Sequence, residues 1–209
     1  MSSTTSDGAQ RSPEAAVAVV LSGVLAVLLA PVSLGLVRET LHFNCSWGIG
    51  GEWGPDGTWL CADGIGYVGV AVALGGMSGL LLLVGLGTSL ARPSSGRSAV
   101  YLVLAALSLV WIGCWTFYAA TAYTGPRPVG EGGQGLWVAT VLPGLALSAL
   151  GLLVGAVGAL TSRRWSPLAL WAGVSMMLLG TTLQPGIGVA TLVSSGMLVA
   201  AGAGRRRAL

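Results

Sequence analysis

The chain has 209 residues, of which 54% are hydrophobic and only 8% are charged, and its formal net charge is +3. A soluble domain carries about 25% charged residues, so this composition excludes an ordinary soluble enzyme or binding domain. The basic residues stand in ones, twos and a final three, which excludes the broad basic surface of a nucleic-acid-binding protein. We therefore predict an all-α, polytopic integral membrane protein.

The chain begins with a small, polar segment, residues 1–14, which we predict to be a disordered cytoplasmic tail. The apolar run 15–37 follows and is longer than the roughly 7–15 residues of a signal-peptide core. This length predicts a retained first transmembrane helix with a kink near Pro31. A cleaved signal peptide is the alternative.

The longest polar interruption is the loop 39–63, ETLHFNCSWGIGGEWGPDGTWLCAD. Cys45 and Cys61 lie in this loop, and we predict that they form a disulfide on the oxidising side of the membrane. Closing a loop of this size stabilises a chain by about 3 kcal/mol. Two free thiols are one alternative, and a metal site that adds His42 and Asp63 is another. Because the ligand spacing is unlike that of typical zinc sites, we predict no metal.

Three tryptophans, Trp47, Trp53 and Trp59, recur every six residues in this loop. Neither a helix nor a strand has that period, so the rings do not mark one face of a regular element. They are interpreted either as anchors at the lipid headgroups or as a ring-lined surface that binds a partner protein, lipid or sugar. We predict a partner-binding loop and assign no role to His42.

The rest of the chain alternates apolar runs with short connections. We predict five further transmembrane helices, at residues 64–91, 98–123, 135–160, 166–183 and 187–204. The last two come from one apolar stretch, which as a single helix would be about 55 Å long and would exceed a hydrocarbon core of about 30 Å. Gln184-Pro185-Gly186 predicts a turn in its middle. A basic cytoplasmic tail, residues 205–209, closes the chain.

The arginines test this count of six spans. With both termini in the cytoplasm, the outer side receives Arg38 and Arg127 and the inner side the other eight arginines, as the positive-inside rule requires. All basic residues are arginine, a bias typical of GC-rich bacterial genomes such as those of actinobacteria. We therefore expect a multi-pass protein of a bacterial cytoplasmic membrane.

Small residues recur at four-residue spacing in three predicted helices. The positions are Ala71, Gly75 and Gly79, then Gly151, Gly155 and Ala159, then Gly196, Ala200 and Gly204. Such faces predict close helix packing, within the chain or against another membrane protein. Cys114 is interpreted as a further small packing residue.

Two octapeptides, SGLLLLVG at 78–85 and SALGLLVG at 148–155, match at six positions. They indicate either a duplicated helical hairpin or a chance match between sequences rich in leucine and glycine.

The predicted spans contain no Asp, Glu, Lys, Arg or His. Ionisable residues mark proton relays, voltage sensors and most chemistry inside membranes, so we expect neither an enzyme nor a cofactor. The sequence favours an accessory or scaffold subunit of a membrane complex, with a membrane-protein partner or a second copy of itself. The alternative is a channel or carrier for a small neutral or lipid-like solute, lined by the hydroxyls of Ser78, Thr88, Ser108, Thr140 and Ser148.

Overall fold

A computed structural model of the chain describes residues 13–48, 57–91, 96–128, 130, 132–161 and 164–205. For residues 204 and 205 it describes the backbone alone. Within these ranges, six helices are long and apolar enough to cross a membrane. The number of spans predicted from the sequence is therefore confirmed by length and composition. The ends of both predicted tails, and Trp53, lie outside the described residues.

The elements follow the predicted order closely. In chain order they are α1 (Pro13–Gly35), the π-helical turn η1 (Leu36–Thr40), β1 (Cys45–Trp47), β2 (Trp59–Cys61), the 3-10 turn η2 (Gly64–Tyr67), α2 (Val68–Leu90), α3 (Arg97–Thr121), α4 (Gly133–Thr140), α5 (Leu142–Leu160), α6 (Ser166–Leu183), the 3-10 turn η3 (Pro185–Ile187) and α7 (Gly188–Arg205).

Two details differ from the sequence prediction. The fourth predicted span, 135–160, is divided into α4 and α5 at Val141, and Pro143 stands at the start of α5, where proline is favoured. The first helix continues through Pro31, and its winding changes further along the chain, at Leu36, where η1 begins.

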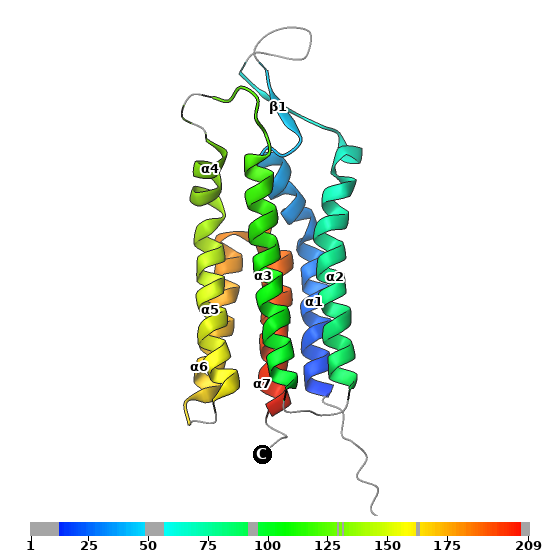
Figure 1. Cartoon of the computed structure of the whole chain (residues 1–209), viewed down its shortest axis with the longest axis vertical. Helices are drawn as coiled ribbons and strands as arrows, with labels where there is room; N and C mark the ends of the chain where they lie inside the picture. The colour runs from blue at the N-terminus through cyan, green and yellow to red at the C-terminus, as the bar shows by residue number, and fades with distance from the viewer. Residues whose placement is uncertain are drawn as a thin grey trace, which may run out of the picture.

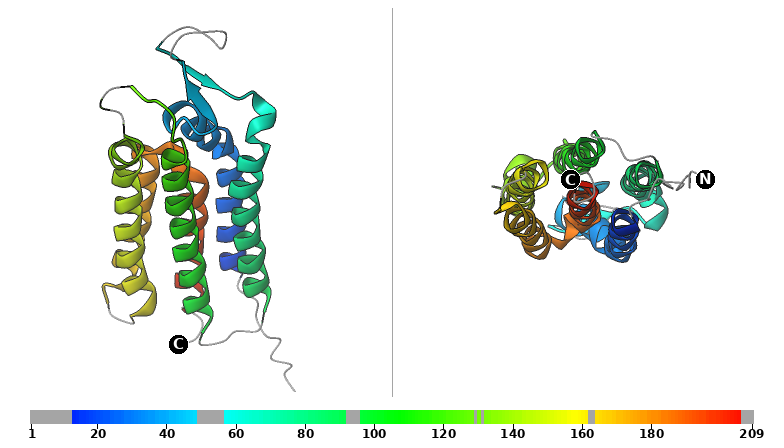
Figure 2. Two further views of the ribbon diagram at one scale, coloured as in Figure 1. Left: turned by 45° about the horizontal axis from the view of Figure 1, so that its top comes forward. Right: turned by 90° about the horizontal axis from the view of Figure 1, so that it is seen from below.

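The last helix, α7, lies in the middle of the bundle and the other long helices surround it (Figure 1; Figure 2, right). In the most apolar 18-residue stretch of this helix, about 89% of the residues are buried, against 28% in the corresponding stretches of α1 and α2. Small and hydroxyl-bearing residues allow this position, because they leave room for neighbouring helices on every side. The closing helix of the chain is therefore the core of the fold.

Hydroxyl groups join α7 to its neighbours. Ser194 Oγ donates to the carbonyl oxygen of Ala105 in α3 at 2.9 Å, and Ser108 Oγ of α3 donates back to that of Ala190 at 3.0 Å. Buried polar groups inside a membrane need such partners, because no water is present to replace them. The reciprocal pair fixes α3 against α7.

The helices α5 and α6 pack closely against each other through glycines on both of them. A Cβ atom added to Gly151 would lie 2.6 Å from the carbonyl oxygen of Gly173, and one added to Gly144 would lie 2.8 Å from that of Gly180. These contacts involve backbone atoms, which cannot rotate away. Only glycine permits this distance between the two helices.

The two matching octapeptides occupy comparable places around α7. Gly85 of α2 lies against Met197, and Gly155 of α5 lies against the next residue, Leu198. The serines that begin the two octapeptides, Ser78 and Ser148, are both buried. The match therefore coincides with a shared packing role against α7.

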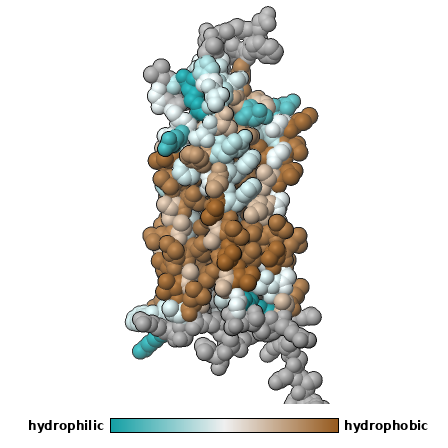
Figure 3. Space-filling model, in the orientation of Figure 1, coloured by the Kyte–Doolittle hydropathy of each residue, from teal (hydrophilic) through white to brown (hydrophobic). Residues whose placement is uncertain are grey.

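The bundle has two different ends. The start of α1 and the end of α7 lie at one end, and the strands β1 and β2 lie at the other, which we call the hairpin end (Figure 1). On the face shown in Figure 3, an apolar band crosses the helices, whereas hydrophilic residues gather over the hairpin end. This distribution matches a helical bundle that spans a bilayer and carries a polar cap on one side.

Candidate functional site

The polar cap is built on a short antiparallel hairpin. Cys45 lies opposite Cys61, and Trp47 lies opposite Trp59. The sulfur atoms of Cys45 and Cys61 are 1.97 Å apart, so the predicted disulfide is confirmed. Because both sulfurs are bonded to each other, neither is available as a thiolate ligand for a metal. We call the described residues 41–48 and 57–63 the disulfide cap.

The chain enters the cap through two residues in the left-handed region, His42 with φ 53° and Asn44 with φ 57°. Histidine and asparagine are among the non-glycine residues most often found there. Asn44 Nδ2 donates to the carbonyl oxygen of Gly66 at 3.3 Å, and the amide of Ala62 donates to the carbonyl oxygen of Asn44 at 3.1 Å. This reversal sets the hairpin across the end of the bundle.

Trp59 is the centre of an aromatic cluster in the cap. Its ring stacks on His42 at 4.2 Å between centroids, and it meets Trp47 and Tyr123 edge-on at 5.3 and 5.4 Å. The amide of Trp47 also donates to Tyr123 Oη at 3.1 Å. The two described tryptophans are half-buried, so they hold the hairpin against the segment that follows α3 and leave only part of each ring exposed.

A second set of contacts fastens the cap to the turn η2 and to α3. Tyr67 Oη donates to the carbonyl oxygen of Phe43 at 2.7 Å, and the Phe43 ring lies 6.0 Å from the rings of Trp115 and Tyr118. The Arg38 guanidinium lies over the Tyr67 ring at 5.8 Å. The cap is thus seated on the bundle.

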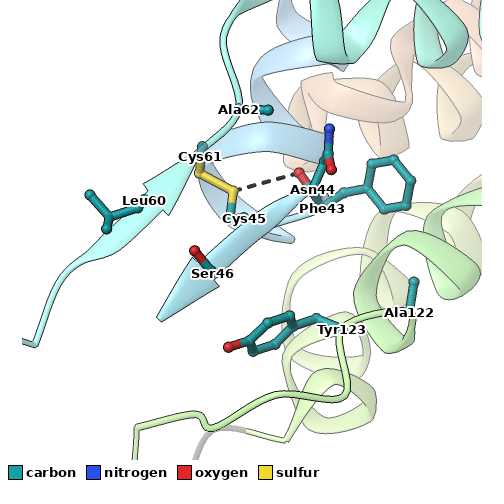
Figure 4. A pocket seen from close by; sticks show the side chains of 9 residues that line it. All are labelled: Phe43, Asn44, Cys45, Ser46, Leu60, Cys61, Ala62, Ala122 and Tyr123. Atoms are coloured by element: carbon teal, nitrogen blue, oxygen red, sulfur yellow. Dashed lines mark hydrogen bonds between the residues drawn. A yellow bond between two sulfur atoms is a disulfide. The ribbon is translucent and has the colours of Figure 1, made fainter. Parts of the chain in front are cut away.

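A pocket of about 520 Å³ opens between the hairpin and the segment after α3 (Figure 4). It is lined by Phe43, Asn44, Cys45, Ser46, Leu60, Cys61, Ala62, Ala122 and Tyr123. The dashed line in Figure 4 joins Cys45 Sγ to the carbonyl oxygen of Phe43 at 3.5 Å; because a disulfide sulfur has no proton to donate, this is a close contact. Two aromatic rings beside amide and hydroxyl groups suit the binding of a neutral polar group.

The predicted small-residue faces divide into filled and open ones. Gly155 lies against Leu198 and Gly196 against Ser22, both within the chain. By contrast, a Cβ atom added to Gly75 or to Gly79 in α2 would meet no atom within 4 Å. The surroundings of Gly204 lie outside the described side chains.

The neighbouring Gly76, which the four-residue pattern does not include, is equally open. Gly75 and Gly76 are exposed on the outside of the bundle, and Val72 and Leu80 beside them are 66% and 56% exposed. We call Gly75, Gly76 and Gly79 the open face of α2. It lies on the outer surface of the bundle, with the bulkier Val72 and Leu80 one turn before and one turn after Gly76.

Four of the five hydroxyls proposed for a solute pathway donate hydrogen bonds within single helices or between helices. Ser148, Thr88 and Thr140 each donate to the carbonyl four residues earlier, at 2.8, 2.8 and 2.7 Å, and Ser108 binds α7 as described above. Ser78 is buried in α2. None of these five residues lines the cap pocket.

Cys114, predicted to be a small packing residue, is exposed on α3 and is free of any disulfide. Sequence reasoning did not identify the cap pocket, because Ala122 and Tyr123 lie far along the chain from the other residues that line it. Comparisons of the chain with models of known protein families, with curated proteins and with solved structures find no match. The functional proposal therefore rests on the geometry described above.

Proposed function

We propose that the chain is a non-enzymatic integral membrane protein that serves as an accessory or scaffold subunit of a membrane complex. The observation that carries this proposal is the open face of α2, where Gly75, Gly76 and Gly79 meet no atom within 4 Å. Glycine lowers helix stability by about 1 kcal/mol relative to alanine. Facing lipid it gains nothing in return, whereas facing another helix it permits close backbone approach.

The occupant of the open face is a transmembrane helix of a partner membrane protein, or of a second copy of this chain. The glycine pairs of α5 and α6 support this assignment, because there the same chain uses small residues to bring two helices together. On α2 the corresponding glycines have no counterpart within the described residues. The disulfide cap, with its aromatic pocket, provides a second contact surface outside the membrane.

The proposed location is a bacterial cytoplasmic membrane, with both termini in the cytoplasm and the hairpin end outside. Two observations support this orientation. The start of α1 and the end of α7 lie together at the end opposite the hairpin (Figure 1), the end to which the positive-inside rule assigns eight of the ten arginines. The Cys45–Cys61 disulfide requires an oxidising compartment.

The alternative function, a channel or carrier, receives less support. A solute pathway needs space near the bundle axis, and α7 occupies that position with about 89% of its most apolar window buried. The proposed lining hydroxyls also donate to backbone carbonyls, which reduces what they offer to a solute. A packed interior favours a role through the outer surfaces.

Purification from the native membrane tests the proposal. A tagged full-length chain is extracted in mild detergent, and stoichiometric partners are identified by mass spectrometry. The variant Gly75→Leu/Gly79→Leu fills the open face, and Ala172→Leu, at an exposed alanine on α6, is the matched control. We expect a membrane protein, or a second copy, that is lost only from the α2 variant. A partner retained by both variants, or a monomer throughout, contradicts the proposal.

A further inference from the structure

A second cavity lies on the membrane-facing side of the bundle, away from the disulfide cap and from α2. It is a groove of about 450 Å³ between α3, from Leu109 to Phe117, and the α4–α5 segment, which contributes Trp137, Leu145 and Ala149. The groove exists because Gly113, Cys114 and Ala149 are small; a larger side chain at any of these positions would fill it. We call this space the α3–α5 groove.

The walls of the groove are entirely apolar. The one polar atom of Trp137, its indole N–H, donates to Thr116 Oγ1 at 2.9 Å. Phe117, with 41% of its surface exposed, meets Trp137 edge-on at 5.4 Å and forms the end of the groove nearest the hairpin. A hydrocarbon occupant fits these walls, because no polar group is presented to it.

An arginine stands just beyond that end. Arg127 Nη2 donates to the carbonyl oxygen of Ala120 at 3.1 Å and to that of Tyr123 at 2.9 Å. Ala120 is three residues past Phe117, a rise of about 4.5 Å along α3. A guanidinium has five N–H donors, so Nη1 and Nε keep three that bind no acceptor among the described residues.

We infer that the α3–α5 groove and Arg127 together bind one phospholipid, with an acyl chain along the groove and the phosphate on the guanidinium. The charge of Arg127 and the aromatic residues beside it agree with this assignment. A planar guanidinium binds phosphate oxygens through two parallel hydrogen bonds, and aromatic residues such as Trp137 and Tyr123 are typical of the headgroup level.

The size of the groove favours a hydrocarbon chain over a transmembrane helix. From Leu109 to Phe117 the groove extends about 12 Å along α3, and a helix of that length and about 10 Å diameter occupies roughly 900 Å³. The groove offers about half of that volume. A helix would therefore seat only part of its diameter in the groove, whereas a hydrocarbon segment about 12 Å long fits within it.

Native mass spectrometry of the full-length, disulfide-bonded chain tests the assignment. The protein is titrated with palmitoyl-oleoyl phosphatidylglycerol and, separately, with palmitoyl-oleoyl glycerol, which carries the same chains without phosphate. Arg127→Gln removes the phosphate donors, and Cys114→Leu/Ala149→Leu fills the groove. The matched controls are Arg38→Gln, at the other described arginine of the hairpin end, and Ala172→Leu on α6.

We expect one tightly bound phosphatidylglycerol, with affinity lowered about tenfold or more by Arg127→Gln, as for the loss of charged hydrogen bonds. The groove-filling variant lowers it similarly, and both controls leave it unchanged. Equal binding of palmitoyl-oleoyl glycerol overturns the assignment of phosphate to Arg127. A dimer or a partner that is lost on filling the groove, with lipid binding unchanged, overturns the lipid assignment as a whole.

Cys114 provides an independent readout that needs no variant in the groove. The chain has three cysteines, and the other two form the disulfide, so a maleimide reagent reports on Cys114. In detergent, phosphatidylglycerol is expected to slow pyrene-maleimide labelling about tenfold in the wild type but not in Arg127→Gln. A labelling rate that does not depend on this lipid contradicts the inference.

Discussion

Alanine substitutions distinguish a glycine that is packed against another helix from a glycine on the open face of α2. In Gly173→Ala, the added Cβ meets the backbone carbonyl of Gly151 and the backbone of Gly155. These atoms cannot move without separating α5 from α6. Overpacking of this kind costs about 1–3 kcal/mol, of which the helix propensity of alanine recovers up to about 1 kcal/mol.

Subtracting this recovery leaves an expected net loss of up to about 2 kcal/mol for Gly173→Ala, or up to roughly 30-fold in the unfolding equilibrium. Gly75→Ala is the matched variant, because its Cβ meets no atom within 4 Å. We expect its free energy of unfolding to equal or slightly exceed that of the wild type. Both are measured in detergent micelles by titration with sodium dodecyl sulfate, with helix content followed by circular dichroism. Equal destabilisation by the two variants refutes the packing described for α5, α6 and α2.

Three further predictions concern the cap and the core. Reduction of the disulfide, or Cys45→Ser with Cys61→Ser, is expected to lower cap stability by about 3 kcal/mol and to expose residues 41–48 and 57–63 to limited proteolysis, while the helix content of the bundle is unchanged. Ser194→Ala, which removes the side-chain donor to the Ala105 carbonyl, is expected to cost about 0.6 kcal/mol in the same detergent titration, the average for such bonds in membrane helices. Trp59→Leu, which removes the stack on His42, is expected to speed amide hydrogen exchange in both strands, whereas an unchanged rate contradicts the central place of this ring.

Much of the fold could be predicted from the chain because the bilayer imposes simple limits on it. The thickness of a hydrocarbon core predicts that residues 168–204 form two helices. Gln184-Pro185-Gly186 forms the turn between them, where Gln184 Oε1 accepts a hydrogen bond from the Gly186 amide at 3.2 Å. The two cysteines of the polar loop 39–63 likewise predicted the Cys45–Cys61 disulfide, because a loop with little apolar surface to bury needs a covalent link. These features depend on local sequence and on the solvent.

The central position of α7 could not be predicted in this way. Transmembrane helices are apolar on all sides, so hydropathy does not distinguish a helix that faces lipid from one that faces protein. A signal was present in Thr191, Ser194 and Ser195, whose spacing places three hydroxyl groups on one side of the helix, all of them buried. Their partners, such as Ala105 in α3, are set by the fold and cannot be read from spacing.

The candidate site was predicted only in part for a similar reason. Spacing separates Trp47 from Trp59 by twelve residues, yet the hairpin register places them opposite each other. The open face of α2 was indistinguishable in sequence from the filled faces of α5 and α7, since all have small residues four apart. What separates them is the presence or absence of a neighbouring helix, which is a property of the assembled bundle.

Crosslinking from α2 in the native membrane tests the central claim most directly. A photoreactive p-benzoylphenylalanine is placed at Gly76, on the open face of α2, and in a second variant at Ala172, which is exposed on α6. The account predicts a discrete protein adduct, of a partner or of a second copy, from Gly76 and none from Ala172. Only lipid adducts from Gly76, or the same protein adducts from both positions, would contradict it.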